Sequence, residues 1–152
     1  MNNLTLTKSD ILNRIPEQYR HFIGLNADTF SNGAIQPMFN FIEAFNLFAS
    51  FAKINKKVEM FFFSTTPGEI ISNAFKIAFT PLNQAIHITQ GDNIYFNLHL
   101  SSQYRNELQI AMYLEEFAHA YMNIYDEILV KKVVAAIYDK VQYDAQTDCY
   151  KL

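Results

Sequence analysis

Two acids and a histidine stand close together in an otherwise apolar stretch of the sequence: Glu115, Glu116 and His119. Residues 103–122 around them contain no Gly or Pro and predict one long helix. Glu115 and His119 are four positions apart, so the helix places them side by side on one face. Apolar residues share that face, which indicates that both side chains are shielded from water. An unpaired carboxylate is costly there, so the pair needs a partner or a purpose.

Two interpretations account for the pair. In the first, Glu115 and His119 form a structural ion pair. In the second, they belong to a metal or catalytic site. A third pattern, Glu116-x-x-His119, matches half of a di-iron carboxylate site, but such a site needs a second copy of the motif, which the sequence lacks. The predicted helix is apolar on its opposite face as well, so we expect it to be the central helix of the domain. That opposite face carries Ile110, Leu114, Phe117 and Tyr121.

Residues 115–123, Glu-Glu-Phe-Ala-His-Ala-Tyr-Met-Asn, resemble the active-site helix of the small HExxH zinc peptidases, the zincins of the ImmA/IrrE-like and SprT-like kinds. In that family two His four positions apart bind zinc, and the Glu between them is the general base. The resemblance implies that Glu116 is the base, His119 the second metal ligand, and Asn123 the substitute for the Gly that ends the helix. The chain departs from the family at the first ligand, where Glu115 replaces His and gives an EExxH motif.

The resemblance also implies a third ligand from the next helix. Glu127 and the neighbouring Asp126 are the only carboxylates near that place. The metal site would then consist of Glu115, His119 and Glu127, holding zinc or another divalent ion such as manganese. The missing His favours the opposite outcome: no metal, and a pseudoenzyme that keeps the fold and binds a protein or peptide partner. The alternative is an active metal-dependent peptidase that uses this Glu/His/carboxylate site.

The rest of the chain must position these residues. Residues 85–89 and 94–100 alternate apolar and polar positions around Gly91 and predict a β-hairpin. Residues 94–100 take the place of the zincin edge strand along which substrate lies. His87 and His99 lie in this hairpin; they are expected to be exposed, with a position near the cleft as the alternative. After the motif helix, residues 126–141 predict a last helix with an apolar face of Ile128, Leu129, Val133, Ala136 and Ile137, and residues 142–152 predict a polar tail.

The first half supplies supporting elements. A Phe-rich stripe predicts a helix over residues 36–53, followed by a strand over residues 58–64. The remaining expectations are a short N-terminal helix capped by Ser9 and broken at Pro16, a loop from Gly24 to Gly33, and a short helix to Lys76 capped by Thr66. This order predicts an α+β fold: a single zincin-like domain over residues 1–152, with a small, mostly antiparallel sheet packed against the motif helix and its flanking helices.

Composition narrows the possible partners. The chain has 152 residues, half of them apolar, with 14 Phe, 9 Tyr and no Trp, which is enough for one well-packed core. A net charge of −3 and the absence of a basic run disfavour nucleic-acid binding. No apolar run approaches the length of a membrane span, and the first residues lack the layout of a signal peptide. Together with the single Cys149, this favours a cytoplasmic protein, and the Asn-, Ile-, Lys- and Phe-rich usage suggests a bacterial or phage-encoded one.

Overall fold

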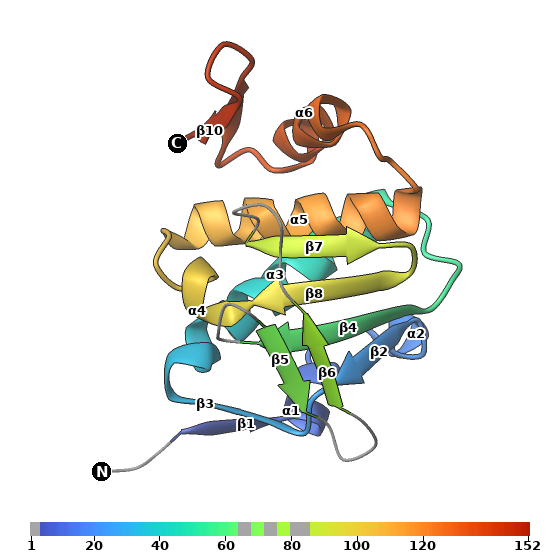
Figure 1. Cartoon of the computed structure of the whole chain (residues 1–152). Coiled ribbons are helices and arrows are strands. Elements are labelled where there is room, and N and C mark those ends of the chain that lie inside the picture. The colour runs from blue at the N-terminus through green and yellow to red at the C-terminus, as the bar shows by residue number, and fades with distance from the viewer. Residues whose placement is uncertain (1–3, 64–67, 72–75, 80–85) are drawn as a thin grey trace.

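The computed structural model of the chain describes residues 4–63, 68–71, 76–79 and 86–152. Its main sheet has the strand order β2 (Ile23–Asn26), β4 (Val58–Phe63), β8 (Asn93–Asn97) and β7 (His87–Gln90). The first three run parallel, while β7 is antiparallel to β8 and forms one edge (Figure 1). The predicted α+β class is confirmed. The expected antiparallel pairing holds for the small hairpins but not for most of this sheet, because a helix connects β2 to β4 and brings the chain back parallel.

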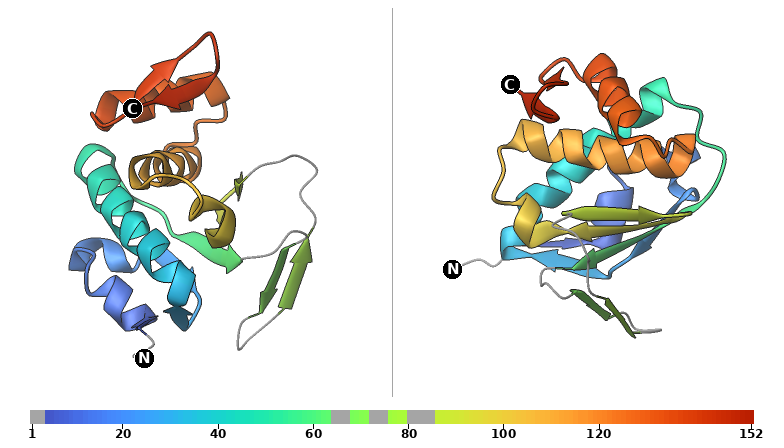
Figure 2. Two further views of the ribbon diagram at one scale, coloured as in Figure 1. Left: turned by 90° about the vertical axis from the view of Figure 1, so that its left-hand side faces the viewer. Right: turned by 45° about the horizontal axis from the view of Figure 1, so that its top comes forward.

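Two long helices, α3 (Ile35–Phe51) and α5 (Asn106–Met122), pack side by side on one face of the main sheet (Figure 2). Phe41 of α3 lies at the centre of this layer. Its ring makes edge-on contacts with Phe96 of the sheet and Phe117 of α5, both with ring centroids 5.5 Å away. The predicted Phe stripe of residues 36–53 is therefore the core face of α3. On the other face of the sheet, Phe61 and Phe63 form a second, smaller cluster with Tyr95.

The predicted hairpin around Gly91 is confirmed as β7 and β8, with Gly91 at a φ of 60° in the turn. Its second strand is shorter than expected. Residues 98–100 leave the sheet because the Asn97 side chain accepts a hydrogen bond from the Leu100 backbone N–H at 2.9 Å and so starts helix α4 (Leu98–Ser101). Strand β8 lies between β4 and β7, so the edge on this side of the sheet is β7, and the prediction that residues 94–100 form the edge is wrong.

The N-terminal region contains more structure than predicted. Strand β1 (Thr5–Thr7) pairs with β3 (Thr29–Ser31), and β3 and all but the first residue of β2 fall inside the stretch expected to be a loop. Helix α1 (Lys8–Leu12) is capped by Thr7 rather than Ser9, because Thr7 and Asp10 form a reciprocal capping box. The break at Pro16 is confirmed, since α2 (Glu17–Arg20) begins directly after it. A 3-10 turn, η1 (Asn32–Ala34), leads into α3.

Strands β5 (Gly68–Ile71) and β6 (Lys76–Phe79) form a separate antiparallel ladder. The helix predicted from Thr66 to Lys76 is therefore wrong over residues 68–71, where the cross-strand pairing of Ile70 with Ile77 takes precedence over the capping pattern. The predicted cap, Thr66, lies outside the described residues.

The C-terminal region is folded where a polar tail was expected. Helix α6 (Glu127–Ile137) is followed by β9 (Gln142–Asp144) and β10 (Cys149–Lys151), which pair as an antiparallel hairpin. Asp148 adopts a φ of 53° in the turn, and its carboxylate binds Lys131 of α6 at 2.9 Å. The predicted apolar face of α6 is also wrong: Val130 and Val134 are buried, whereas Ile128 and Leu129 are exposed. Tyr138 and Val141, which follow the helix, are buried as well, so the side of α6 that carries Val130 and Val134 faces the core.

None of the helices in the described part of the chain combines the length and the apolar character that a membrane crossing requires.

Candidate functional site

Helix α5 carries the EExxH residues, and contacts at both ends fix its position. It starts at Asn106 instead of residue 103 because Gln109 turns back and donates a hydrogen bond to the Tyr104 carbonyl at 2.8 Å. Asn40 of α3 donates to both Asn106 and Gln109, at 3.0 and 3.1 Å, which ties the first turn of α5 to α3. At the other end Asn123 adopts the left-handed conformation, with φ 56° and ψ 38°, as predicted from its place in the motif.

The face of α5 that holds Glu115 is less buried than predicted. Tyr104 and Met122 at its ends are exposed, and Leu108, Met112 and Glu115 are half-buried. Glu116 and His119 are more deeply buried, with 8% and 9% of each residue exposed. The reason is the packing of α5 between two neighbours: α3 covers the side of Phe117 and Tyr121, and strand β7 approaches the side of Glu116.

Glu116 lies against the edge strand. The hydroxyl of Thr89 in β7 donates a short hydrogen bond to Oε2 of Glu116. Burial raises the pKa of Glu116 from 4.5 to about 7, and the Thr89 hydrogen bond and the charge of His119 only partly oppose that rise. A carboxyl group with such a pKa exchanges protons near neutral pH, which is what a general base requires.

The His119 ring has an oxygen atom at each nitrogen. Nδ1 lies 2.5 Å from the backbone oxygen of Ile124, just beyond the end of α5. Nε2 lies 3.4 Å from Oε2 of Glu127, at the start of α6. Both oxygens are acceptors, whereas a neutral imidazole carries one N–H. When Nδ1–H donates to Ile124, the free electron pair of Nε2 faces the Glu127 carboxylate, and a bound cation would satisfy both groups.

The two acidic candidates of α6 have separate roles. Asp126 is the N-cap of the helix, and its Oδ1 accepts the backbone N–H groups of Ile128 and Leu129, both at 2.9 Å. Glu127 is the one beside His119, and its role as the third ligand stays a prediction. Its side chain is 68% exposed, so this contact lies at the rim of the site.

Glu115 points toward the C-terminal region rather than into an ion pair with His119. In the described part of the chain, the ion-pair partner of His119 is Glu127, and the Glu115–His119 ion pair of the first interpretation is not formed. Burial raises the pKa of Glu115, and the nearby Tyr150 hydroxyl and Lys131 ammonium group lower it in part. Tyr150 comes from β10, and its hydroxyl oxygen is buried without a hydrogen-bond partner.

The described residues contain no group of three or more His, Cys, Asp and Glu side chains close enough together to hold a metal ion. Glu115, His119 and Glu127 are brought to one region where α5, α6 and β10 meet, but not into a coordination shell. The metal site formed by these three residues therefore stays a prediction.

The two hairpin histidines differ from each other. His87 is buried in β7, so its expected exposure is wrong: its Nδ1 accepts the Asn97 backbone N–H at 3.1 Å and its Nε2 has no partner. Burial lowers the pKa of His87 to about 3, which keeps the ring neutral. His99 is exposed as expected, although it lies on α4 and not in the strand.

Sequence reasoning missed two residues of this site. Thr89 binds Glu116. It is two positions from His87, so both side chains lie on the same face of the strand, and this is the signal that Thr89 faces α5. Tyr150 covers Glu115, and the sequence carries no signal for it because the polar composition of residues 142–152 predicts a tail.

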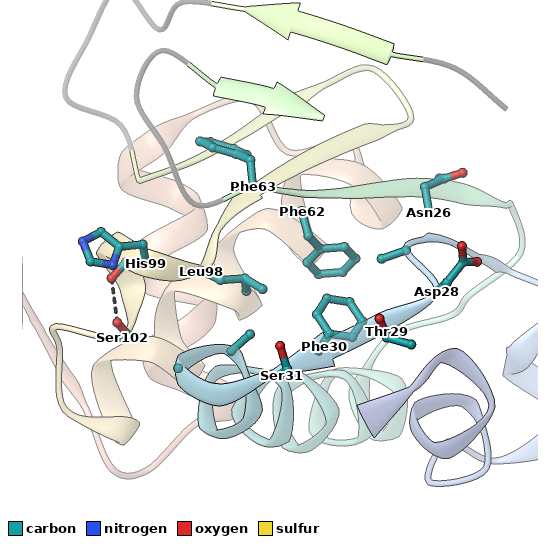
Figure 3. Close-up of a pocket in the computed structure, with 13 residues that line it drawn as sticks. Asn26, Asp28, Thr29, Phe30, Ser31, Phe62, Phe63, Leu98, His99 and Ser102 are labelled. Carbon is teal, nitrogen blue, oxygen red and sulfur yellow. Dashed lines mark hydrogen bonds between the residues drawn. The ribbon is translucent and has the colours of Figure 1, made fainter. Parts of the chain in front are cut away.

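A surface hollow of about 550 Å³ lies elsewhere, at the carboxyl ends of the parallel strands. Figure 3 shows the rings of Phe30 and Phe62 together in its floor and His99 at one side. A second hollow of about 550 Å³ lies near Gln36 and Tyr104. Neither is lined by Glu116 or His119.

Comparisons with protein families, curated proteins and solved structures give no match to the chain.

Proposed function

We propose that the chain is a degenerate zincin-like protein, a catalytically impaired or inactive metallopeptidase homologue that acts as a binding module for a protein or peptide. The arrangement of the motif helix supports this. An antiparallel edge strand, β7, runs beside α5, and its Thr89 binds Glu116 of the EExxH motif. His119 and Glu127 come together from successive helices, as the zincin resemblance implies for two metal ligands.

The position of Glu115 carries the proposal that catalysis is impaired. In a zincin this residue is the first metal-binding His. Here it is a carboxylate half-buried beside Tyr150 and Lys131. Lys131 is in turn held by Asp148 of the hairpin, so the C-terminal residues provide Glu115 with a polar environment of its own. A carboxylate with these neighbours is a poor substitute for an imidazole that must meet His119 at one ion.

The alternative, an active metal-dependent peptidase, is favoured by Glu116 and His119. The tautomer that donates from Nδ1 to Ile124 leaves Nε2 free for a ligand, which is how zinc-binding histidines are oriented. A divalent ion held by Glu115, His119 and Glu127 would act as a Lewis acid. Glu116, with a pKa of about 7 and fixed by Thr89, would accept a proton from a water molecule at Oε1 or Oε2.

Metal content separates the two candidates. Protein purified without chelator is analysed by elemental mass spectrometry and then titrated with zinc by calorimetry, beside the Glu115→His variant. We expect the natural sequence to contain no stoichiometric metal and the variant to take up one zinc, since it regains two imidazoles on adjacent turns. Glu107→His, the same change nearer the start of α5, is the matched control and should not gain zinc.

Stoichiometric metal in the natural sequence, with peptide cleavage lost in Glu116→Gln, would replace the binding-module proposal by the peptidase. A Glu115→His variant that folds normally but takes up no zinc would reject a zincin-like site altogether.

The proposed partner is a protein or peptide rather than a nucleic acid, in keeping with the net charge of −3. We also propose a cytoplasmic location in a bacterium, or in a phage-infected cell, because Cys149, an exposed free thiol, suits a reducing compartment.

A further inference from the structure

The hollow at the carboxyl ends of the parallel strands has the position of a ligand site. One wall comes from the end of β2 and the segment that follows it, residues 26–34, and the other from α4, which follows β8. The end of the middle strand, β4, lies between these walls. Open sheets with parallel strands bind their ligands outside the carboxyl ends, on loops that the rigid sheet positions. The volume of about 550 Å³ falls within the range of small-molecule pockets.

Aromatic rings form the floor of the hollow. Phe30 of β3 meets Phe62 of β4 edge-on, with ring centroids 5.0 Å apart and an interplanar angle of 86°. Phe62 also stacks on Phe96 at 5.4 Å and meets Phe41 edge-on at 5.7 Å, so the core holds this ring in place. Phe62 is nevertheless only half-buried, and it lines the hollow. A fixed aromatic surface of this kind suits a flat aromatic ligand, which packs on it by stacked or edge-on contact.

The charge of the lining is negative. Among the described residues that line the hollow, Asp28 supplies a carboxylate, and none is Lys or Arg. Asp28 is exposed, and its backbone carbonyl accepts the Lys8 backbone N–H at 2.9 Å, which fixes its place. It lies at one side of the hollow and His99 at the opposite side (Figure 3). A carboxylate beside aromatic rings attracts a cation, both by its own charge and through the negative faces of the rings.

Hydroxyl groups complete the polar part of the lining. Thr29 and Ser31 stand on either side of Phe30 in β3, and both are exposed. On the opposite wall, the Ser102 hydroxyl donates to the His99 backbone carbonyl at 2.6 Å, which leaves its oxygen as an acceptor. An ammonium group has three N–H donors and no acceptor, so a carboxylate with neighbouring hydroxyl oxygens matches it. A phosphate or carboxylate group would meet the charge of Asp28 without a cation to offset it.

We propose that this hollow binds a small molecule that combines a flat aromatic ring with a positively charged amine. The ring packs on Phe30 and Phe62, and the ammonium group lies at Asp28. The site shares no residue with the EExxH region, so it depends neither on a metal nor on the partner proposed for that region.

Tryptamine, an indole that carries an alkylammonium group, is the probe, and a two-dimensional NMR titration of the isotope-labelled protein is the measurement. We expect saturable binding with a Kd on the order of 1 mM, as suits a ligand of this size. The largest shift changes should fall on the backbone amides of residues 28–34 and 98–102. Indole-3-propionate has the same ring with a carboxylate in place of the ammonium group, and it should bind roughly tenfold more weakly or worse. Hexylamine, which has the ammonium group without the ring, should also bind more weakly.

Asp28→Asn keeps the size of the side chain and removes its charge. It should weaken tryptamine binding roughly fivefold and remove most of the preference for tryptamine over indole-3-propionate. Asp139→Asn is the matched control, the same change at an exposed position beyond α6, and should leave both affinities unchanged. Circular dichroism melts confirm that both variants are folded.

Three results would overturn the proposal. The first is no saturable binding of tryptamine up to about 5 mM, fivefold above the expected Kd. The second is shift changes centred outside the two walls of the hollow. The third is an affinity for tryptamine that equals the affinity for indole-3-propionate or hexylamine, or that does not change in Asp28→Asn.

Discussion

On the side of α5 that faces α3, the rings of Phe117 and Tyr121 lie against Phe45 and Phe48 with centroids 5.4 to 6.0 Å apart. Phe117, Phe45 and Phe48 are fully buried, and the Tyr121 hydroxyl donates to the Phe22 carbonyl at 2.9 Å. The rings on this side therefore pack against other rings, and the Tyr121 hydroxyl has a hydrogen-bond acceptor. Dispersion and the removal of apolar surface from water act in the same direction here.

On the side that faces β7 and α6, the same helix buries charged groups with few partners. Glu116 has one hydroxyl donor, His119 meets two oxygen acceptors, and Glu115 is near a hydroxyl that makes no hydrogen bond. Burying charged groups without full pairing costs stability, and a folded protein that keeps such groups typically does so at a functional site. One side of α5 therefore holds the fold together, while the other lowers stability and carries the candidate chemistry.

Phe117→Ala gives the largest expected effect. It opens a cavity between Phe41, Phe45 and Phe96, so unfolding in denaturant should show a loss of about 3–5 kcal/mol. Phe51→Ala, at an exposed site on α3, is the control and should change stability by less than about 0.5 kcal/mol. A loss below about 1 kcal/mol for Phe117→Ala would show that α5 does not pack as described.

Glu116→Gln should change stability in the opposite direction and stabilise the protein above pH 7. The folded protein raises the pKa of Glu116 from 4.5 to about 7, so it binds this proton more tightly than the unfolded chain does. Stability from this group is fully present below pH 4.5 and is lost as pH rises to about 7, in total roughly 3 kcal/mol. Gln keeps the shape and remains neutral, so the variant should be more stable than the natural sequence above pH 7 and similar to it below pH 4.5.

The measurement is a series of denaturant melts from pH 4 to 8 with chelator present, so that no metal contributes. Glu107→Gln, on the first turn of the same helix, is the control and should leave the pH dependence unchanged. Parallel pH profiles for Glu116→Gln and the natural sequence would show that Glu116 is solvated in solution.

The contact between His119 and Glu127 should contribute much less. It spans 3.4 Å, but the Glu127 side chain is 68% exposed, and water screens the interaction. A double-mutant cycle with His119→Ala and Glu127→Ala, measured in chelator, should therefore give a coupling energy below about 1 kcal/mol. Coupling above about 2 kcal/mol would indicate a buried structural pair and would weaken the comparison with the well-packed side.

Elements with a strong local signal could be predicted from the sequence. The 3–4 spacing of Phe and Met predicts α3, and the alternation of apolar and polar residues around Gly91 predicts the hairpin of β7 and β8. Both patterns are strong enough to hold whatever the distant contacts are. The place of Asn123 in the motif predicts the left-handed residue that ends α5. Glu127 lies beside His119, but its predicted role as a metal ligand stays a prediction.

Short elements that depend on distant partners could not be predicted. Strand β2 is four residues long and contains Gly24, where an added Cβ would lie 2.0 Å from the Glu59 carboxylate. Only pairing with β4 makes this segment a strand. The C-terminal hairpin also depends on a distant partner, because the contact of Asp148 with Lys131, seventeen positions earlier, fixes it against α6. The polar composition of the segment gives no indication of that contact. The same hairpin positions Tyr150 at the candidate site.

Tyr150→Phe should produce the smallest effect and tests the poorly paired side most closely. The Tyr150 ring packs against the core, while its hydroxyl is buried near Glu115 and makes no hydrogen bond of normal geometry. Removing an unpaired buried hydroxyl leaves the packing intact and relieves a desolvation cost, so stability at pH 7 should stay equal or rise by up to about 1 kcal/mol. Tyr143→Phe is the control with the opposite expectation, because the Tyr143 hydroxyl donates to Asp148 at 2.7 Å, and its loss should lower stability slightly. Both are measured by denaturant melts. If Tyr150→Phe instead loses more than about 1 kcal/mol, the hydroxyl donates to Glu115 in solution, and Glu115 is better paired than the geometry indicates.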